Sequence, residues 1–265
     1  MRRLHGQRRM SFYGERSVMI DRSKVAPLFA GWNETMIRSY LQGHMGYALA
    51  DNEASPTSAQ IVTGDICFFA GTPNDALIEQ AAAPEIVPQN EDWCRAVERV
   101  LGAGVKQRFR YAIKKEGDVF DHAKLAAYTR SLPDGFSLAP FDEAICRMAN
   151  EESWSCDFCA LFHNPADFVA RGLGVAVLCQ GRPVSGASSY LVCDGGIEIE
   201  IDTKPEFRQR GLATACGAQL ILESLKRGLY PSWDAYDLRS VALAEKLGYH
   251  LDHPYVIYEK TESNA

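Results

Sequence analysis

The segment IEIEIDTKPEFRQRGLATACGAQLILESLKRG, residues 197–228, constrains the fold of this chain more than any other segment. Isoleucine alternates with acidic residues from 197 to 202, which is typical of a β-strand whose two faces meet different surroundings. A short basic loop follows, and apolar residues then recur at helical spacing until Gly228, a residue that favours a helix end. The segment therefore predicts a strand, a short connection and a helix that covers a sheet.

The loop between the predicted strand and helix has the composition of an anion-binding site. The free N–H groups and the positive dipole end of a helix attract an anion, and the helix is expected to begin at about Gly211. A glycine there lets a phosphate approach the backbone, while Arg208 and Arg210 add charge-assisted donors. We expect residues 209–214 to bind a diphosphate. The alternative is an ordinary helix start with basic residues in the preceding loop.

The predicted strand carries three acids on one face, Glu198, Glu200 and Asp202. Burying unpaired charges costs several kcal/mol, so this face is expected to meet water, a cation or a cleft. Crowding and desolvation raise the pKa of a carboxyl group, which improves it as a proton acceptor. Glu198 or Glu200 is therefore the predicted general base. The alternative is a solvated strand face that takes part in no chemistry.

Composition argues against several classes of protein. The 265 residues carry a formal net charge of −6, which disfavours a protein whose main role is binding nucleic acid. The N-terminus is basic but contains no long apolar segment, so neither a secretory signal nor a membrane helix is expected. Several of the eight cysteines lie within apolar runs, as expected of reduced thiols in a cytoplasmic protein. Cys156, Cys159 and His163 lack a fourth ligand with suitable spacing, so no metal site is expected.

The order of predicted elements indicates an α/β protein of the α+β layered type. We expect a basic tail over residues 1–22, a smaller α/β domain over 23–134 and a second domain over 135–265, with the boundary at Pro133-Asp134-Gly135. The second domain reads as strand, helices, three strands in a meander, helix, strand, helix and strand, which predicts a mixed sheet with flanking helices. In the first domain, residues 24–43 have helical spacing and residues 59–71 read as one buried strand.

Two of these segments resemble motifs of one enzyme family. Residues 208–213, RQRGLA, resemble the acyl-CoA pyrophosphate signature Gln/Arg-x-x-Gly-x-Gly/Ala of the GNAT acetyltransferases. Residues 237–249, DLRSVALAEKLGY, resemble the second signature of that family. The wider pattern is similar to the branch that includes the zwittermicin A resistance acetyltransferase. That branch carries an N-terminal segment, and residues 31–46 resemble this segment as well.

The resemblance implies an N-acetyltransferase that uses acetyl-CoA as co-substrate and needs no metal. An amine of a small polar molecule would attack the thioester directly in a ternary complex, with the first domain forming a wall of the acceptor pocket. No nucleic-acid or membrane partner is expected. The residues expected to bind the co-substrate are Ile201, Asp202, Thr203, Arg208, Gln209, Arg210, Gly211, Leu212, Ala213, Thr214 and Ser240.

The chain departs from the family pattern at two positions. Asp237 stands where an asparagine is usual, so its contact with the co-substrate is in question. Ala244 stands where many members have the tyrosine that protonates the departing thiolate. Another tyrosine (Tyr236, Tyr255 or Tyr258) would then donate the proton, or the thiolate would leave unaided, which its ordinary pKa near 8.5 permits. These departures keep open a second hypothesis, a non-enzymatic acyl-CoA sensor or scaffold.

Overall fold

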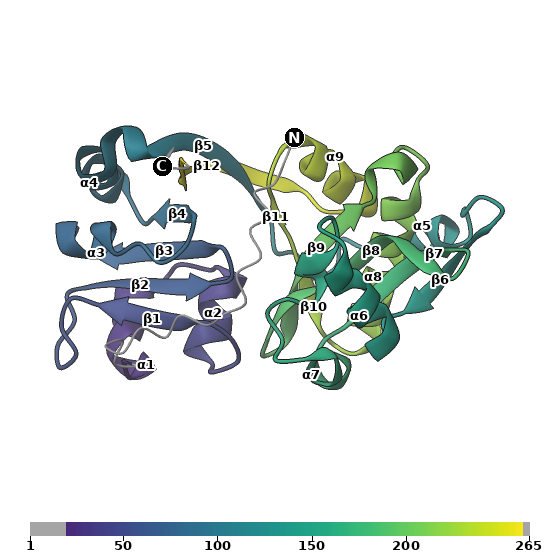
Figure 1. Cartoon of the computed structure of the whole chain (residues 1–265), viewed down its shortest axis with the longest axis horizontal. Helices are drawn as coiled ribbons and strands as arrows, with labels where there is room; N and C mark the ends of the chain where they lie inside the picture. Colours follow the sequence, from purple (N-terminus) through teal and green to yellow (C-terminus); the bar gives the residue numbers. More distant parts are fainter. Residues whose placement is uncertain (1–19, 262–265) are drawn as a thin grey trace.

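The computed structural model describes residues 20–261, which form two mixed sheets flanked by helices (Figure 1). The α/β fold class is thus confirmed. The first nineteen residues of the predicted tail lie outside the described residues. The predicted boundary at residues 134 and 135 falls in the turn before β6 and stays a prediction.

The first sheet contains seven strands in the order β1-β2-β3-β4-β12-β5-β11. Helices α3 and α4 cover one face, and α1, η1 and α2 lie on the other side, as Figure 1 shows. The strands are β1 (Tyr47–Ala50), β2 (Ser58–Thr63), β3 (Ile66–Gly71), β4 (Glu85–Pro88), β5 (Val105–Ile113), β11 (Asp234–Ala235) and β12 (Leu251–Lys260). The helices are α1 (Arg22–Val25), η1 (Ala26–Phe29), α2 (Thr35–Leu41), α3 (Asp75–Glu79), α4 (Glu91–Leu101) and η2 (Gly102–Gly104).

The second sheet contains five strands in the order β10-β9-β8-β7-β6. Helix α8 covers one face with α5 packed against it, and α6, η3 and α7 lie on the other side. The strands are β6 (Phe136–Pro140), β7 (Gly174–Cys179), β8 (Arg182–Cys193), β9 (Gly196–Thr203) and β10 (Tyr230–Ser232). The helices are α5 (His122–Thr129), α6 (Glu143–Glu151), η3 (Cys156–Phe158), α7 (Pro165–Arg171), η4 (Pro205–Phe207), α8 (Leu212–Lys226) and α9 (Leu238–Leu247).

The last strand joins the two halves of the chain. β12 pairs antiparallel with β5 along most of its length and with β4 at its end, so it lies inside the first sheet. In Figure 1, β5 and β12 run between the two blocks of the molecule. The chain therefore returns from its second half to complete a sheet that its first half began.

One prediction of local structure in the first half was wrong, and another was confirmed with interruptions. Residues 59–71, predicted as one strand, form the β2–β3 hairpin, because Gly64 adopts a φ of +60° and Gly64-Asp65 make a two-residue turn. Residues 24–43, which have helical spacing, are largely helical, but the helix is divided into α1, η1 and α2. The 3-10 helix η1 begins at Ala26 with Pro27 in its first turn, and the chain then turns at Gly31 before α2.

The apolar core has two parts, one on each face of the first sheet. The smaller part lies beneath α3 and α4 around Trp93, Phe69 and Tyr258. The larger part fills the space between the first sheet, α2 and both faces of the second sheet. Polar side chains that lie between the two sheets are therefore held by packing on both sides.

Candidate active site

The second sheet opens at one position. β9 pairs in parallel with β10 at Gly196–Tyr230, Ile197–Pro231 and Glu198–Ser232. The chain then leaves β10 and pairs through β11 with β5 of the first sheet. Among the described strands, none pairs with residues 199–203 on the edge of β9 that faces away from β8. An extended ligand with amide groups can satisfy such an edge by adding to it as a strand.

The predicted anion-binding loop lies at the far end of that open edge. Residues 208–211 are exposed, and Gly211 adopts a φ of +77°, a left-handed conformation that glycine allows at little cost. No side chain caps α8. Within residues 20–261, no backbone N–H of residues 209–214 donates to a protein oxygen. These amides are the groups that a diphosphate would accept from.

The two arginines of the loop are held by contacts within the site. Arg208 Nε donates to the carbonyl oxygen of Thr203 at 3.0 Å, and its Nη2 lies 3.3 Å from Asp202 Oδ1. Arg210 Nη2 donates to the Glu206 carbonyl oxygen at 3.3 Å, and its guanidinium lies over the Phe207 ring. Arg208 therefore ties the loop to the end of β9, and both cations stay at the rim of the exposed turn.

Glu198 lies where the sheet begins to open. Its side chain is 3% exposed, and neither carboxylate oxygen has a hydrogen-bond partner in the described part of the chain. Burial raises the pKa of Glu198 to about 8, and repulsion from Glu34 and Asp234 acts in the same direction. Lys115 and the nearby Ser232 hydroxyl act in the opposite direction, and the effect of Lys115 is larger than that of Asp234 but smaller than those of burial and Glu34. A carboxyl group with this pKa can accept a proton near neutral pH.

Glu200 and Asp202 share a strand face with Glu198 but have different surroundings. Both are only partly buried. Asp202 pairs with Arg208, and Glu200 lies close enough to Cys156 to help raise the pKa of that thiol, which burial raises most. The strict alternation along β9 therefore leads to three separate environments, and the assignment of either glutamate as the base stays a prediction.

Comparison with known proteins identifies the family. The family model for GNAT acetyltransferases matches residues 26–258, which is most of the chain. The chain belongs to the GNAT acetyltransferase family. It is thus an acyltransferase enzyme, and the match includes the N-terminal half as well as the two signature segments.

Two relatives resemble this GNAT protein over nearly their whole length. A GCN5-related N-acetyltransferase-like protein from Streptococcus suis, known from a crystal structure, is 42% identical, with a TM-score of 0.87 over 91% of this chain and 98% of that chain. YdfB of Bacillus subtilis, described as an uncharacterised N-acetyltransferase, is 26% identical over 228 residues, covering 80% of this chain and 85% of its own length. A fungal glucosamine N-acetyltransferase region shares the fold alone, with 10% identity and a TM-score of 0.56 over 90% of this chain and 36% of that chain.

The second GNAT signature forms the start of α9. Asp237 caps this helix, since its side chain accepts from the backbone N–H groups of Arg239 and Ser240. The guanidinium of Arg239 also lies 2.6 Å from Asp237 Oδ2. Burial acts to raise the pKa of Asp237, but the hydrogen bonds and the Arg239 charge together lower it. Arg239 is a cation near the site that the sequence reasoning missed. Ser240 accepts from Trp233 Nε1 at 3.0 Å, so its hydroxyl orients the tryptophan beside the opening.

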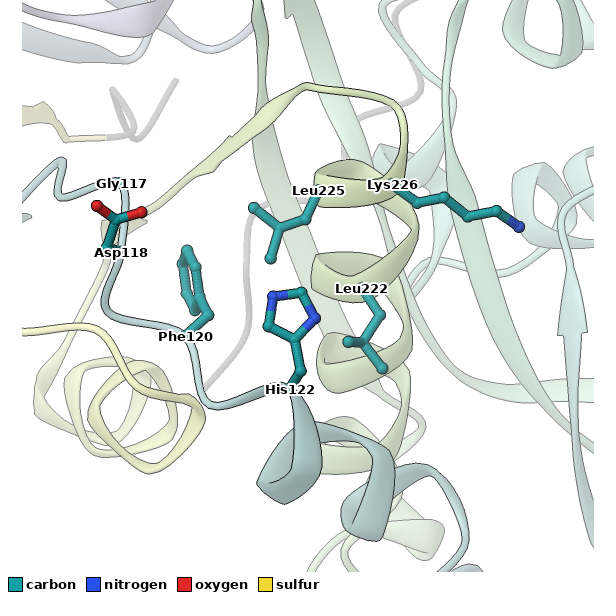
Figure 2. Close-up of a pocket in the computed structure, with 7 residues that line it drawn as sticks. All are labelled: Gly117, Asp118, Phe120, His122, Leu222, Leu225 and Lys226. Atoms are coloured by element: carbon teal, nitrogen blue, oxygen red, sulfur yellow. The ribbon is translucent and has the colours of Figure 1, made fainter.

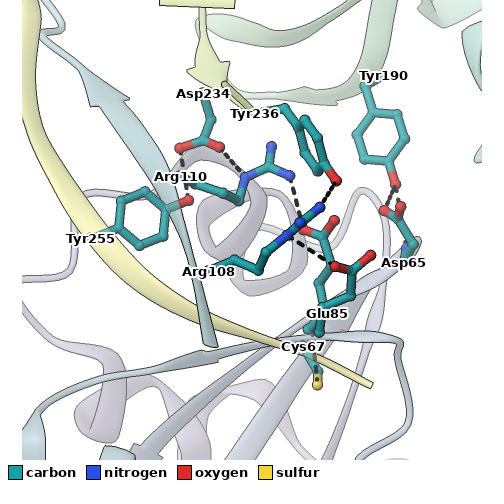
Figure 3. A network of polar contacts seen from close by, with 10 residues as sticks. Asp65, Cys67, Glu85, Arg108, Arg110, Tyr190, Asp234, Tyr236 and Tyr255 are labelled. Carbon is teal, nitrogen blue, oxygen red and sulfur yellow. Dashed lines mark hydrogen bonds and ion pairs between the residues drawn. The ribbon is translucent and has the colours of Figure 1, made fainter. Parts of the chain in front are cut away.

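A polar network lies between the sheets next to the opening (Figure 3). Arg110 Nε donates to Asp234 Oδ1 at 2.6 Å and Arg110 Nη1 to Glu85 Oε2 at 2.9 Å. The Tyr255 hydroxyl donates to the other oxygen of Asp234 at 2.8 Å. Burial and the Asp234 charge raise the pKa of Tyr255 well above its usual value. Asp234 is thus paired on both oxygens, in contrast to Glu198.

The structure separates the three tyrosines considered as proton donors. Tyr258 belongs to the core beneath α3 and α4, and its hydroxyl donates to Glu98 Oε1 at 2.6 Å. Tyr255 packs against the larger core, which lies on the opposite face of the first sheet. The Tyr236 hydroxyl accepts from Arg108 Nη2 at 2.8 Å. Tyr255 and Tyr236 therefore lie with the interface network, and Tyr258 does not.

A surface hollow lies beside the C-terminal half of α8, as Figure 2 shows. Its lining combines apolar and polar side chains: Asp118, Phe120, His122, Leu222, Leu225 and Lys226. At 1.5 Å per helical residue, Leu225 lies about 20 Å along α8 from Leu212. None of the predicted site residues lines this hollow, so we do not assign the chemistry to it.

No helix within residues 20–261 is long and apolar enough to cross a membrane. In the same part of the chain, no group of three or more His, Cys, Asp or Glu side chains is arranged to hold a metal ion. The eight cysteines are all described, and they are free thiols.

Proposed function

We propose that this GNAT protein transfers an acetyl group from acetyl-CoA to an amine of a small polar molecule. The observation that carries the proposal is the open edge of β9, which begins at Glu198 and leads to the exposed loop of residues 208–211. From Glu198 to Thr203 the strand spans about 17 Å at 3.3 Å per residue. An extended thioester arm along this edge would bring its reactive end to Glu198 while its diphosphate lies at the loop.

The proposed chemistry is direct attack in a ternary complex. The acceptor enters as an ammonium ion, which has no lone pair and must first lose a proton. Glu198 is the better candidate for the base, because its buried carboxylate has a pKa raised to about 8 and lacks a hydrogen-bond partner among the described residues. Glu200, partly exposed on the same strand, remains the alternative base.

Loop residues and strand residues would divide the binding of acetyl-CoA. The unpaired amides of residues 209–214 would accept the diphosphate, with Arg208 and Arg210 at its rim. Ile201, Asp202 and Thr203 would pair with the arm through their backbone. Ser240 would act through Trp233, which it orients. The resemblance to the zwittermicin A branch further suggests an aminopolyol-like acceptor, and eight free thiols support a reducing, cytoplasmic location.

The test combines thiol release with calorimetry. Thiol release from acetyl-CoA is followed with a panel of small amines, and CoA binding is measured by titration calorimetry. Glu198→Gln is expected to lower turnover at least tenfold without changing the dissociation constant of CoA. Unchanged turnover in both Glu198→Gln and Glu200→Gln would refute the assignment of the base. CoA binding without turnover of any amine would instead favour the sensor hypothesis.

A further inference from the structure

The N-terminal half places a carboxylate beside Glu198. Glu34 directly precedes α2, and this helix is fixed to the second sheet by two buried hydrogen bonds. The Thr35 hydroxyl donates to Ser232 Oγ at 2.8 Å, and the Ser39 hydroxyl donates to the Val192 carbonyl oxygen at 2.7 Å. Ser232 is the residue that pairs with Glu198 across β9 and β10. Packing of α2 therefore holds Glu34 next to the point where the sheet opens.

The groups that face the two glutamates do not neutralise both. Asp234 adds a third carboxylate, but Arg110 and Tyr255 already pair with its two oxygens. Lys115 is the cation that lowers the pKa of Glu198, and its Nζ donates to the Asn33 carbonyl oxygen at 2.6 Å. The charge of Glu198 or Glu34 also contributes to the raised pKa of four further groups, Cys193, Tyr230, Tyr249 and Tyr255. Glu198 is left with two buried oxygens that have no partner within residues 20–261.

The two glutamates restrict each other's ionisation. Burial raises the pKa of Glu34, and repulsion from Asp234 adds to the effect, while Lys115 opposes it. Glu34 is in turn the largest electrostatic contribution to the raised pKa of Glu198. Repulsion between the two carboxylates means that ionisation of one disfavours ionisation of the other. An ammonium ion placed between the two carboxyl groups relieves this repulsion, so the pair favours binding of a cation.

We infer that Glu34 and Glu198 together bind the ammonium group of the acceptor, and that the acceptor belongs to the amines without a carboxylate next to the nitrogen. This inference rests on the proposed function. Glu34 is partly exposed whereas Glu198 is buried, so the ammonium enters past Glu34 and reaches Glu198 last. An α-amino acid would bring its own carboxylate against Glu34 and Asp234, and repulsion between like charges at a desolvated site would exclude it.

The pair also accounts for the protons of the reaction. The ammonium ion gives one proton to an ionised carboxylate of the pair, which leaves a neutral amine. The nitrogen lone pair attacks the thioester carbonyl carbon, a C–N bond forms, and the C–S bond breaks. The second proton on nitrogen goes to the departing thiolate. The products are the amide, the free thiol and one proton that the pair returns to solvent.

Ethanolamine and serine are a matched pair of probes, because serine differs from ethanolamine by the carboxylate alone. Titration calorimetry with the full chain in saturating CoA at pH 7.5 measures their affinities. We expect ethanolamine to bind at least tenfold more tightly than serine. Glu34→Gln and Glu198→Gln should each weaken ethanolamine binding at least tenfold and leave CoA binding unchanged. Glu79→Gln, at an exposed position on α3, serves as the control for loss of one carboxylate.

Three binding results would overturn the inference. These are equal affinities for the two probes, an ethanolamine affinity that Glu34→Gln does not change, and no ethanolamine binding up to 50 mM. Unchanged CoA affinity in Glu34→Gln shows that the variant is folded. A loss of amine binding then reports on the ammonium-binding site formed by Glu34 and Glu198. If ethanolamine binds as expected but no amine is acetylated, the proposed function fails and this inference holds. If amines are acetylated equally by Glu34→Gln and wild type, the inference fails alone.

Discussion

Replacing Glu198 by glutamine should stabilise the folded chain at neutral and alkaline pH. The folded-state pKa of Glu198 is about 8 against an ordinary value of 4.5, so the folded chain holds a proton that the unfolded chain has released. Stability contributed by that proton is full below pH 4.5 and is lost as pH rises through 8. Glutamine has a similar shape and no charge, so the variant lacks this loss.

The magnitude follows from the linkage relation. Each pH unit between the two pKa values changes the free energy of unfolding by about 1.36 kcal/mol. Between pH 5 and pH 9, the variant should therefore gain roughly 4 kcal/mol relative to wild type. For a chain of this length, about 2 °C in Tm corresponds to 1 kcal/mol, so the relative gain in Tm is about 8 °C.

The assay is urea unfolding followed by tryptophan fluorescence at pH 5, 7 and 9, with thermal unfolding as a second measurement. Glu79→Gln, exposed on α3, controls for a general change of net charge. A stability difference between Glu198→Gln and wild type that does not vary with pH would refute the reasoning. A difference that shrinks as pH rises would refute it as well, because the sign of the linkage would then be wrong.

Two further predictions test the loop and the interface network. Gly211→Ala should cost about 1 kcal/mol, because alanine pays for the left-handed conformation at a φ of +77°, and should weaken CoA binding at least tenfold. The control is Gly181 in the β7–β8 hairpin, which has a φ of +75° and equally open space around it. Gly181→Ala should cost as much stability while CoA binding, measured by calorimetry, stays unchanged. Equal CoA affinity in both variants would contradict the loop assignment. Arg110→Ala should lower the free energy of unfolding by about 3–5 kcal/mol in urea, since it leaves Asp234 and Glu85 buried without their cation. Arg99→Ala breaks only the exposed pair with Asp75 and should cost under about 1 kcal/mol, so similar costs for the two arginine variants would count against this account.

Local features of the sequence predict the elements that carry the chemistry. The alternation from Ile197 to Asp202 is β9, the basic turn ends at a left-handed Gly211, and the apolar repeat that follows is α8. Asp237 caps α9 as expected of an aspartate before a helix. These features depend on residues within about one turn of helix or one strand, so the order of elements in the second half follows from the sequence alone.

Tertiary structure decided what surrounds those elements. A period of two places Glu198, Glu200 and Asp202 on one face, yet it does not indicate which neighbour each side chain meets. Glu198 is buried because α2 packs against the second sheet, and the two hydrogen bonds of this contact join residues 197 and 153 positions apart. Likewise, β12 lies between β4 and β5 through pairing with residues of the first half of the chain, such as Tyr258 with Ile86. Glu34 had no local signal beyond its place before a helix, since its proximity to Glu198 arises only when the two halves pack together.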